Sequence, residues 1–258
     1  MWLDTAILFL FGTILGSFLN ALAFRYNTGK SMWGRSACLS CGKTLSAFEL
    51  VPVLSYLFLH GKCKGCKSAI SAQYPFVEIS AGVLLVFSYY TSAGNTSLFL
   101  VTLAFFSTLL FISIYDLRHT IIPNAFVYSA AALGLIHLFL SIQSGSLEGI
   151  DSVAGPLLAL PLFLLWIYSH GKWIGLGDAK LMLAVGWFLG ISSGLAAFLL
   201  SFWIGALVSL ALLGLSRFAK GGRRVTMKTE IPFGPFIVLG CAISYFAYVD
   251  IFTLTNFF

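Results

Sequence analysis

Long stretches without charge constrain the fold of this chain more than any other feature of its sequence. Six segments free of Asp, Glu, Lys and Arg lie between charged residues, and they are 20, 37, 29, 20, 36 and 19 residues long. Only 9% of the 258 residues are charged, whereas a soluble domain averages about 25%. This composition excludes disordered, collagen-like and disulfide-rich secreted proteins, and it predicts an all-α polytopic membrane protein.

The lengths of these segments predict about eight transmembrane helices. A helix needs roughly 20 apolar residues to cross the hydrocarbon, so the two longest segments are expected to be helical hairpins that break at 91–97 and near 190–194. The first span is expected to be retained rather than cleaved as a signal peptide, because it lacks a basic start. Continuous apolar runs argue against a β-barrel. The predicted spans are residues 3–24, 76–91, 98–116, 123–142, 152–170, 179–190, 194–216 and 232–250.

The basic residues predict the orientation of these helices. All 15 Lys and Arg residues lie in connections on one side of the predicted membrane, or at helix ends that face them. The positive-inside rule makes this side cytoplasmic and places both termini outside the cytoplasm. The formal net charge of +6 is therefore interpreted as a topology signal, and nucleic acid is not expected as a partner. The basic connections are residues 25–75, 117–122, 171–178 and 217–231.

One polar insert, residues 25–75, stands apart from the apolar segments. It holds four of the five cysteines as two C-x2-C pairs: Cys38 and Cys41, then Cys63 and Cys66. Two such pairs supply the four thiolates of a tetrahedral structural zinc site, and a metal would stabilise so small a domain. A dithiol redox centre and unmetallated thiols are the alternatives, although a reducing cytoplasm offers a redox pair no obvious oxidant.

Two aspartates mark the candidate catalytic site. Asp116 lies at the end of the third predicted span, and Asp178 lies at the start of the sixth within Gly175-Leu-Gly-Asp. Both are expected at the cytoplasmic ends of their helices, so packing of these helices would pair them. Paired carboxylates share a proton, and one can activate water while the other protonates a scissile carbonyl. Gly175 and Gly177 would permit close approach of a substrate backbone, and Lys180 would favour the ionised form of Asp178.

A purely structural role is the alternative for these acids. Asp178 could cap a helix, and Asp116 could pair with Arg118 at the membrane interface. Glu78 and Glu230 also lie at predicted cytoplasmic helix ends and are expected to be interfacial. The four histidines show no ligand spacing, and neither a G-x-S-x-G nor an H-E-x-x-H motif is present.

These residues resemble a known family. Tyr115-Asp116 together with Gly175-Leu-Gly-Asp178 is similar to the GxGD aspartic membrane proteases, and further motifs resemble the bacterial prepilin peptidases, also called type IV leader peptidases. The similarity covers about residues 12–240. The further motifs are Gly16-Ser-Phe-Leu-Asn20, Arg25, Arg35-Ser-Ala-Cys38, Cys41, Pro52-Val-Leu-Ser-Tyr56, Gly61-Lys-Cys63, Cys66, Ile70-Ser71, Tyr74-Pro75, Glu78, Ile122-Pro123, Lys180 and Ile231-Pro-Phe-Gly-Pro235.

The resemblance implies a bifunctional enzyme of the bacterial cytoplasmic membrane. Such an enzyme cleaves the short basic leader of type IV prepilins or pseudopilins and then N-methylates the new terminal residue with S-adenosylmethionine. Asp116 and Asp178 would be its catalytic aspartates. Three domains are expected: a first helix at 1–24, a tetracysteine domain at 25–75 and a transmembrane protease domain at 76–258. The chain departs from the family at Leu39, where Pro is usual, and at Asn124, where Asp is frequent.

Two other functions compete with this reading. A proton-coupled transporter could use Asp116 and Asp178 as carriers, but transporter sites lie near the midplane in repeated broken helices. A membrane scaffold with a zinc knuckle would need no catalysis, and its acids would be interfacial only. A leader-cleavage assay separates these functions. No residue of the sequence identifies a methyl-donor site.

Overall fold

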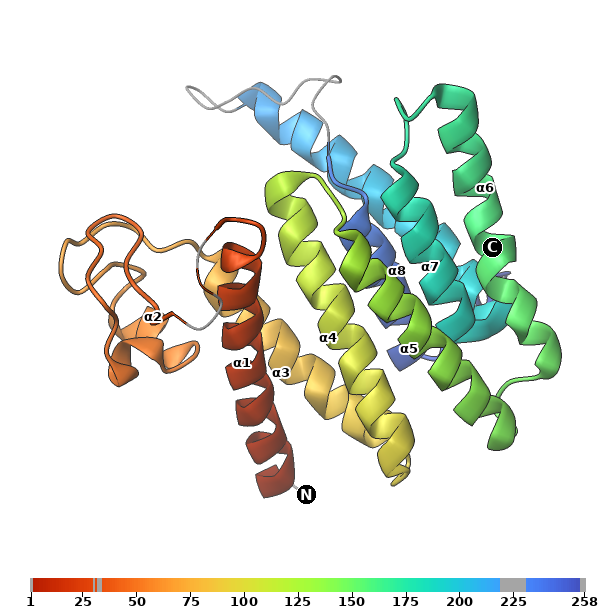
Figure 1. Cartoon of the computed structure of the whole chain (residues 1–258), viewed down its shortest axis with the longest axis horizontal. Helices are drawn as coiled ribbons and strands as arrows, with labels where there is room; N and C mark the ends of the chain where they lie inside the picture. The colour runs from red at the N-terminus through yellow and green to blue at the C-terminus, as the bar shows by residue number, and fades with distance from the viewer. Residues whose placement is uncertain (1, 30, 32–33, 219–230, 256–258) are drawn as a thin grey trace. The chain divides into compact units, whose positions relative to one another are not determined.

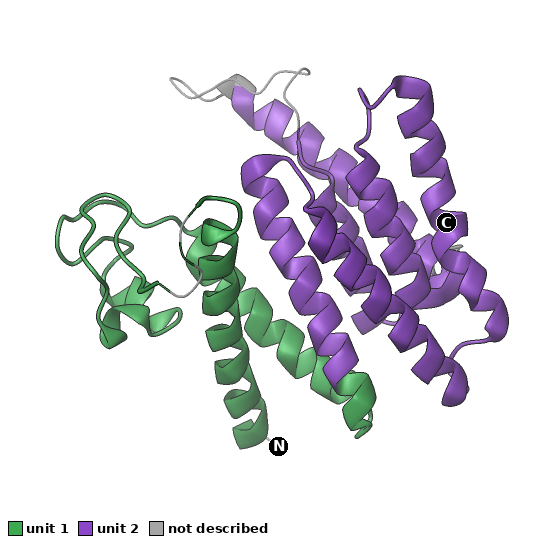
Figure 2. Ribbon diagram, in the orientation of Figure 1, with its two compact units in different colours: residues 1–99 green, residues 100–258 purple. Residues whose placement is uncertain are grey.

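The structure, a computed structural model, describes residues 2–29, 31, 34–218 and 231–255. It divides into two compact units, residues 1–99 and 100–258, which are coloured separately in Figure 2. Five basic residues used to predict the orientation lie outside the described residues: Lys30, Lys220, Arg223, Arg224 and Lys228. Glu230, which was expected to be interfacial, lies outside them too.

The predicted all-α fold is confirmed across the described part of the chain, which contains helices and isolated bridges but no strand. Figure 1 shows the order of these elements. The long helices are α1 (Trp2–Arg25), α3 (Gln73–Thr91), α4 (Thr96–His119), α5 (Asn124–Gln143), α6 (Ala154–Ser169), α7 (Leu176–Phe218) and α8 (Gly234–Phe246). The short elements are η1 (Ala47–Leu50), α2 (Leu54–Phe58), η2 (Gly149–Val153) and α9 (Ile251–Thr255).

The helices follow the predicted spans, and the predicted break between the sixth and seventh spans is present. Helices α1, α3, α4, α5 and α6 match the first five spans, and α8 matches the last. The sixth and seventh spans are two helices that join directly at Gly190, where φ is 76° and ψ is −173°, and they share the label α7. Five described segments are long and apolar enough to cross a membrane. They are Trp2–Arg25, Thr96–His119, Asn124–Gln143, Gly149–Ser169 and Leu176–Ser216, whereas Gly234–Phe246 is shorter.

Glycines let the two long helices of the first unit approach closely. A Cβ added at Gly12 would lie 2.6 Å from the backbone oxygen of Ala81. One added at Gly16 would lie 2.8 Å from the Cα of Glu78. Close backbone packing through residues spaced four apart is a common way for membrane helices to associate, because hydrocarbon gives no hydrophobic drive. The first unit therefore has a rigid base from which the insert projects.

Stacked aromatic rings form the centre of the second unit. The rings of Phe105 in α4 and Phe188 in α7 stack at 3.9 Å between centroids. His137 of α5 also stacks on Phe188, with 3.9 Å between the ring centroids. The ring of Tyr245 in α8 lies 5.0 Å from that of Phe188. Four helices thus meet at one aromatic cluster, which fixes their relative heights.

The break in α7 is capped from the neighbouring turn. Asp151 in η2 accepts a hydrogen bond from the backbone N–H of Ile191 at 2.8 Å, directly after Gly190. A Cβ at Gly190 would lie 2.7 Å from the same carboxylate oxygen. The positive φ and this close contact both favour glycine, so the predicted hairpin break is a helix restart that Asp151 holds in place.

Candidate active site and metal centre

Asp116 lies near the carboxyl end of α4 and is 4% exposed. The backbone N–H of Gly234 donates a hydrogen bond to its Oδ2 atom at 3.1 Å. Gly234 is the first residue of α8, where helix geometry leaves backbone N–H groups without an intrahelical partner. The start of α8 therefore supplies a partner that a buried carboxylate needs.

Asp178 lies in the first turn of α7 and is 8% exposed. Its Oδ2 atom accepts a hydrogen bond from the N–H of Gly175 at 3.2 Å, and its own N–H donates to the carbonyl of Gly175 at 3.2 Å. This reciprocal pair closes the turn before α7. Asp178 therefore also caps the start of α7, which is the structural role that was the alternative to catalysis.

The structure brings Asp116 and Asp178 together. They interact electrostatically, although they lie in different helices of the second unit. Ile122 links their surroundings, because a Cβ at Gly177 would lie 2.9 Å from the Cβ of Ile122 and one at Gly234 would lie 3.4 Å from its Cδ1. Two buried carboxylates at neighbouring helix ends form the candidate active site.

The predicted support residues surround this pair in different ways. A Cβ at Gly175 would lie 3.3 Å from Asp178 Oδ2, so this glycine borders the carboxylate directly. The space beside Gly177 is filled by Ile122. Lys180 Nζ donates to Asn124 Oδ1 at 3.0 Å and to the hydroxyl of Tyr128 at 3.4 Å. The ammonium group therefore joins the starts of α5 and α7, and its described hydrogen bonds do not go to Asp178.

Two residues of the site were not assigned a role by the sequence. Gly234 holds Asp116, and its Cβ would lie 2.7 Å from Asp116 Oδ2, so a side chain would collide with the carboxylate. Ile122 fills the space between Gly177 and Gly234. The signal for Gly234 was the Pro232-Phe-Gly-Pro235 motif, since a proline in the first turn marks a helix start.

The four insert cysteines converge on one point. The Sγ atoms of Cys38, Cys41, Cys63 and Cys66 all lie within 4.8 Å of one another. Zinc–sulfur bonds of 2.3 Å in a tetrahedron place sulfurs about 3.8 Å apart, and the Sγ atoms of Cys38 and Cys66 are 3.8 Å apart. This cluster could hold a metal ion.

Two knuckles of the same shape present these sulfurs. The N–H of Cys38 donates to the carbonyl of Lys43, and the N–H of Cys63 donates to the carbonyl of Ser68, each at 2.9 Å. The residue directly after each second cysteine is left-handed, with φ 71° at Gly42 and φ 61° at Lys67. The Oγ of Ser68 also lies 3.1 Å from the sulfur of Cys66, a contact that sequence spacing did not indicate.

The electrostatics of the cluster favour a cation. Backbone hydrogen bonds from Cys41 and Ser40 lower the pKa of Cys38 to about 6, so this sulfur is largely thiolate at neutral pH. The backbone hydrogen bond from Lys43 lowers the pKa of Cys41, but the adjacent sulfurs of Cys38 and Cys66 outweigh it and raise that pKa to about 11. Hydrogen bonds with Ser68 lower the pKa of Cys66 as well, whereas Cys41 resists ionisation unless a metal ion shares its charge. The donor set therefore fits zinc.

Comparison with known proteins decides the family. Residues 10–92 match the bacterial peptidase A24 N-terminal domain, and residues 103–210 match the type IV leader peptidase family. A Bacillus subtilis (strain 168) protein named prepilin leader peptidase/N-methyltransferase is 33% identical over 242 residues, which cover 93% of each chain. The chain belongs to the type IV leader peptidase family. The predicted family and enzyme class are thereby confirmed.

Other members of the leader peptidase family give the same picture. The proteins of Pseudomonas putida and Aeromonas hydrophila with the same name are 31% and 29% identical to this chain. The matches cover 88% and 92% of this chain and 85% and 89% of the relatives. No solved structure matches the chain.

Proposed function

We propose that this protein removes the short basic leader of type IV prepilins or pseudopilins, with Asp116 and Asp178 as its catalytic pair. The observation that carries the proposal is the meeting of these two buried carboxylates at helix ends in the second unit. The relatives' names support the substrate class.

The chemistry follows from the pairing. Two close carboxylates hold one proton more easily than two negative charges, so the pair acts as a coupled acid and base. One carboxylate takes a proton from water as the water attacks the scissile carbonyl, and the partner protonates the carbonyl oxygen. When the C–N bond of the tetrahedral intermediate breaks, the first carboxyl gives its proton to the leaving amine, and the second carboxylate takes a proton back from the hydroxyl of the intermediate. The reaction needs no metal at the aspartates and no covalent intermediate.

The described hydrogen bonds suit these roles. In each aspartate Oδ2 is held by one backbone N–H, from Gly234 or from Gly175, and no described residue donates to Oδ1. A carboxylate fixed through one oxygen keeps its other oxygen available for water or substrate. Because the holding groups are backbone atoms at helix starts, they orient the carboxylates without adding a competing charge.

Membrane topology brings the substrate to this place. We propose that the end of the second unit with Arg118, Lys172 and Lys180 faces the cytoplasm, and that both termini lie outside it. Glu148 and Asp151 lie at the opposite ends of the helices. A basic leader is retained on the cytoplasmic side by the same rule, so its scissile bond lies at the depth of the aspartates. This topology places the protein in the bacterial cytoplasmic membrane.

The insert and the methyl donor complete the proposal. Cys38, Cys41, Cys63 and Cys66 would hold a structural zinc ion that stabilises the domain at 25–75, between the helix at 1–24 and the protease domain at 76–258. The same enzyme would N-methylate the new terminal residue, as its relatives' names state for them. S-adenosylmethionine would supply the methyl group, and no residue is assigned to it.

A reconstituted assay tests the proposal. Purified protein in lipid vesicles is given a prepilin with an intact leader and S-adenosylmethionine carrying a labelled methyl group. Mass spectrometry should find a shortened pilin that carries the label on its new terminus. A control prepilin with a bulky residue before the cut should stay intact. Failure of the enzyme to shorten several prepilins and pseudopilins would overturn the substrate class, and shortening without label would remove only methyl transfer.

A further inference from the structure

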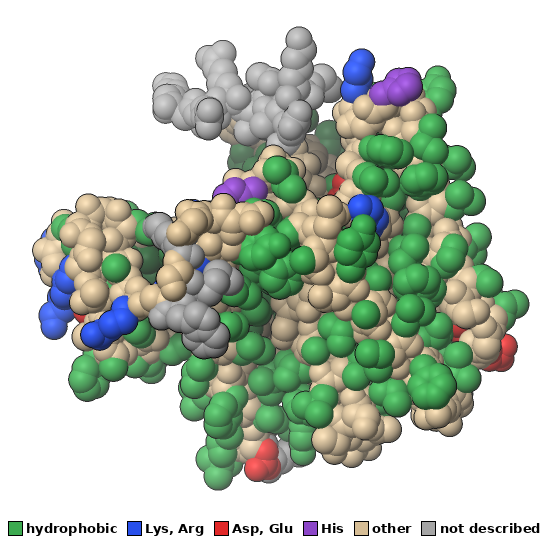
Figure 3. Space-filling view, in the orientation of Figure 1, with side chains coloured by type: hydrophobic (Ala, Val, Ile, Leu, Met, Phe, Trp, Pro, Cys, Tyr) green, Lys and Arg blue, Asp and Glu red, His purple; other side chains and the backbone are tan. Residues whose placement is uncertain are grey.

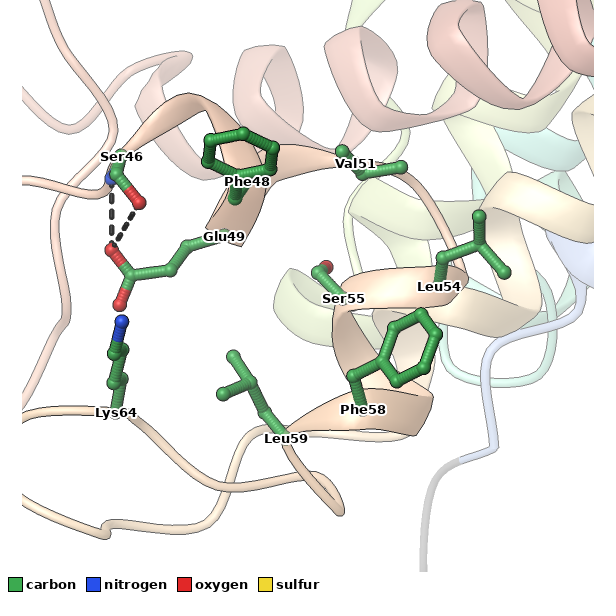
Figure 4. A pocket seen from close by; sticks show the side chains of 9 residues that line it. All are labelled: Ser46, Phe48, Glu49, Val51, Leu54, Ser55, Phe58, Leu59 and Lys64. Carbon is green, nitrogen blue, oxygen red and sulfur yellow. Dashed lines mark hydrogen bonds between the residues drawn. The ribbon is translucent and has the colours of Figure 1, made fainter.

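An apolar groove lies on the insert, and none of the four cysteines lines it. It has a volume of about 420 Å³ and lies between η1 and α2. Figure 4 shows Phe48 on one side and Phe58 on the other, with Glu49 and Lys64 at one end. Three large apolar side chains around this groove are exposed: Phe48 is 88% exposed, Phe58 78% and Leu57 62%. These three residues are named the apolar ridge.

Membrane-spanning helices do not explain this exposure. Large apolar side chains are expected on the lipid-facing sides of α1 or α5, but the apolar ridge lies on a four-residue 3-10 turn and a five-residue helix. Neither element can cross a bilayer. A cluster of exposed aromatic residues on a polar insert marks an interaction surface.

The ridge has a fixed position within the first unit. Val53, directly before α2, has a left-handed backbone with φ 61°, which is costly for a β-branched residue. Its N–H donates to the buried carboxylate of Glu78 in α3 at 2.7 Å. The chain enters the insert from the end of α1 and leaves into the start of α3, and Figure 1 draws α2 beside the carboxyl-terminal half of α1 rather than beyond its end. Glu78 therefore holds α2 close to the level at which these helices leave the membrane.

The charge of the insert selects its partner. Residues 25–75 contain seven Lys or Arg residues and one acid, Glu49, which is paired with Lys43. Lys62, Lys64 and Lys67 are exposed. Figure 3 shows blue side chains of the insert beside green apolar ones at its lower edge. Four thiolates outweigh the two positive charges of a zinc ion, yet the insert would remain basic with that ion bound.

We propose that the insert docks on the membrane surface. The apolar ridge lies among the headgroups and upper acyl chains, and Lys62, Lys64 and Lys67 contact anionic headgroups. Aromatic side chains next to lysines are the usual composition of surfaces that bind anionic membranes. A basic prepilin leader fits less well, because the lysines would repel it. Docking does not depend on the proteolytic reaction, so the two proposals can fail separately.

Photocrosslinking in the full chain tests the contact. Phe58 or Phe48 is replaced by p-benzoylphenylalanine, and the protein is placed in nanodiscs of phosphatidylcholine with or without phosphatidylglycerol. A leader-bearing prepilin is present throughout. A third protein carries the probe at Phe139, which is 61% exposed on α5 and serves as the lipid-facing control. Mass spectrometry identifies each adduct.

We expect lipid adducts at positions 48 and 58, and more of them when phosphatidylglycerol is present. Replacing Lys62, Lys64 and Lys67 together with Gln should lower these adducts by about fivefold or more in anionic nanodiscs, and leave those at position 139 unchanged. Adducts with the prepilin would make the groove a substrate site. Adducts with a second copy would make it an oligomer contact. A lack of adducts at 48 and 58, with lipid adducts at 139, would show that the apolar ridge lies in water. Each of these three results overturns the proposal.

Discussion

The metal centre and the aspartate site use opposite means to bring distant residues together. Four cysteines converge in a small insert with little apolar core, where turns set their positions and a metal ion would hold them. Asp116 and Asp178 converge in a packed helical unit, where aromatic contacts such as Phe105–Phe188 set the helices and backbone N–H groups hold the carboxylates. We infer that the first site depends on its ligand for its shape, whereas the second is shaped by the fold before substrate arrives.

Removing the metal gives the largest expected contrast between the regions. Cys63→Ser should lower the zinc content from about one ion per chain to nearly none, because a closed structural site needs all four thiolates. Residues 25–75 should then become sensitive to protease, while circular dichroism of the spans stays unchanged. Cys241→Ser, which alters a buried cysteine outside the cluster, is the control. A metal-free insert that resists protease as well as the wild type would contradict the inference that the insert depends on its metal ion.

A small change at the aspartate site should have a large effect without touching the metal. In Gly234→Ala the new Cβ would lie 2.7 Å from Asp116 Oδ2, so the carboxylate or α8 must shift. We expect cleavage to fall by about 100-fold, the size of effect that an ångström of misplacement can cause. Zinc content should not change.

Gly214→Ala is the matched control for this variant. A Cβ at Gly214 would meet no atom within 4 Å. This substitution should keep full activity and can raise helix stability, because alanine is the better helix former. Equal activity of the two variants would show that the space beside Gly234 is not needed to keep Asp116 in position.

A substitution at the contact between α5 and α7 tests the packing of the second unit and should have a smaller effect. Asn124→Asp would place a carboxylate opposite the Lys180 ammonium, which now donates to Asn124 at 3.0 Å. We expect stability to rise by about 0.2–1 kcal/mol, the usual range for an exposed ion pair. Thermal unfolding in nanodiscs measures the change. In the Lys180→Met background the gain should vanish, and a gain that persists would mean that the two side chains do not interact.

The smallest expected effect concerns pH and the insert. The N–H and hydroxyl of Ser46, with Lys43, lower the pKa of Glu49 to about 2. A depressed pKa stabilises the fold above the unfolded value of 4.5 and loses this contribution as pH falls toward 2. Glu49→Gln should therefore speed hydrogen exchange at residues 46–50 by the same factor from pH 8 to 5. A difference between variant and wild type that shrinks toward pH 5 would indicate an ordinary carboxyl.

The sequence was sufficient where the pattern is local or repeated. Charge-free segments predicted the helices, because a span must be apolar along its whole length, and even the break at Gly190 could be located. The pairing of Asp116 with Asp178 followed from helix ends on one side of a membrane. C-x2-C spacing indicated the metal centre because each knuckle is set by a few neighbouring residues.

Contacts between distant segments could not be predicted from the sequence. Gly234 reaches Asp116 across 118 residues, and only packing of α4 against α8 shows that a helix start meets a carboxylate. Gly177 was expected to make room for substrate, yet it accommodates Ile122. Lys180 was expected to act on Asp178, whereas its bonds go to α5. In each case the residue type signalled importance, and its partner depended on which helices pack together.

Leader cleavage by Asp116→Asn and Asp178→Asn tests the central claim most directly. Asparagine keeps the size of the side chain and cannot transfer the proton, so each variant should lose cleavage by about 100-fold to 10,000-fold. Both should retain membrane insertion, thermal stability and zinc content, since the metal centre belongs to the first unit and the aspartates to the second. Purified protein in lipid vesicles with a leader-bearing prepilin provides the measurement. Cleavage near the wild-type rate by either variant would contradict the assignment of that aspartate as a catalytic residue.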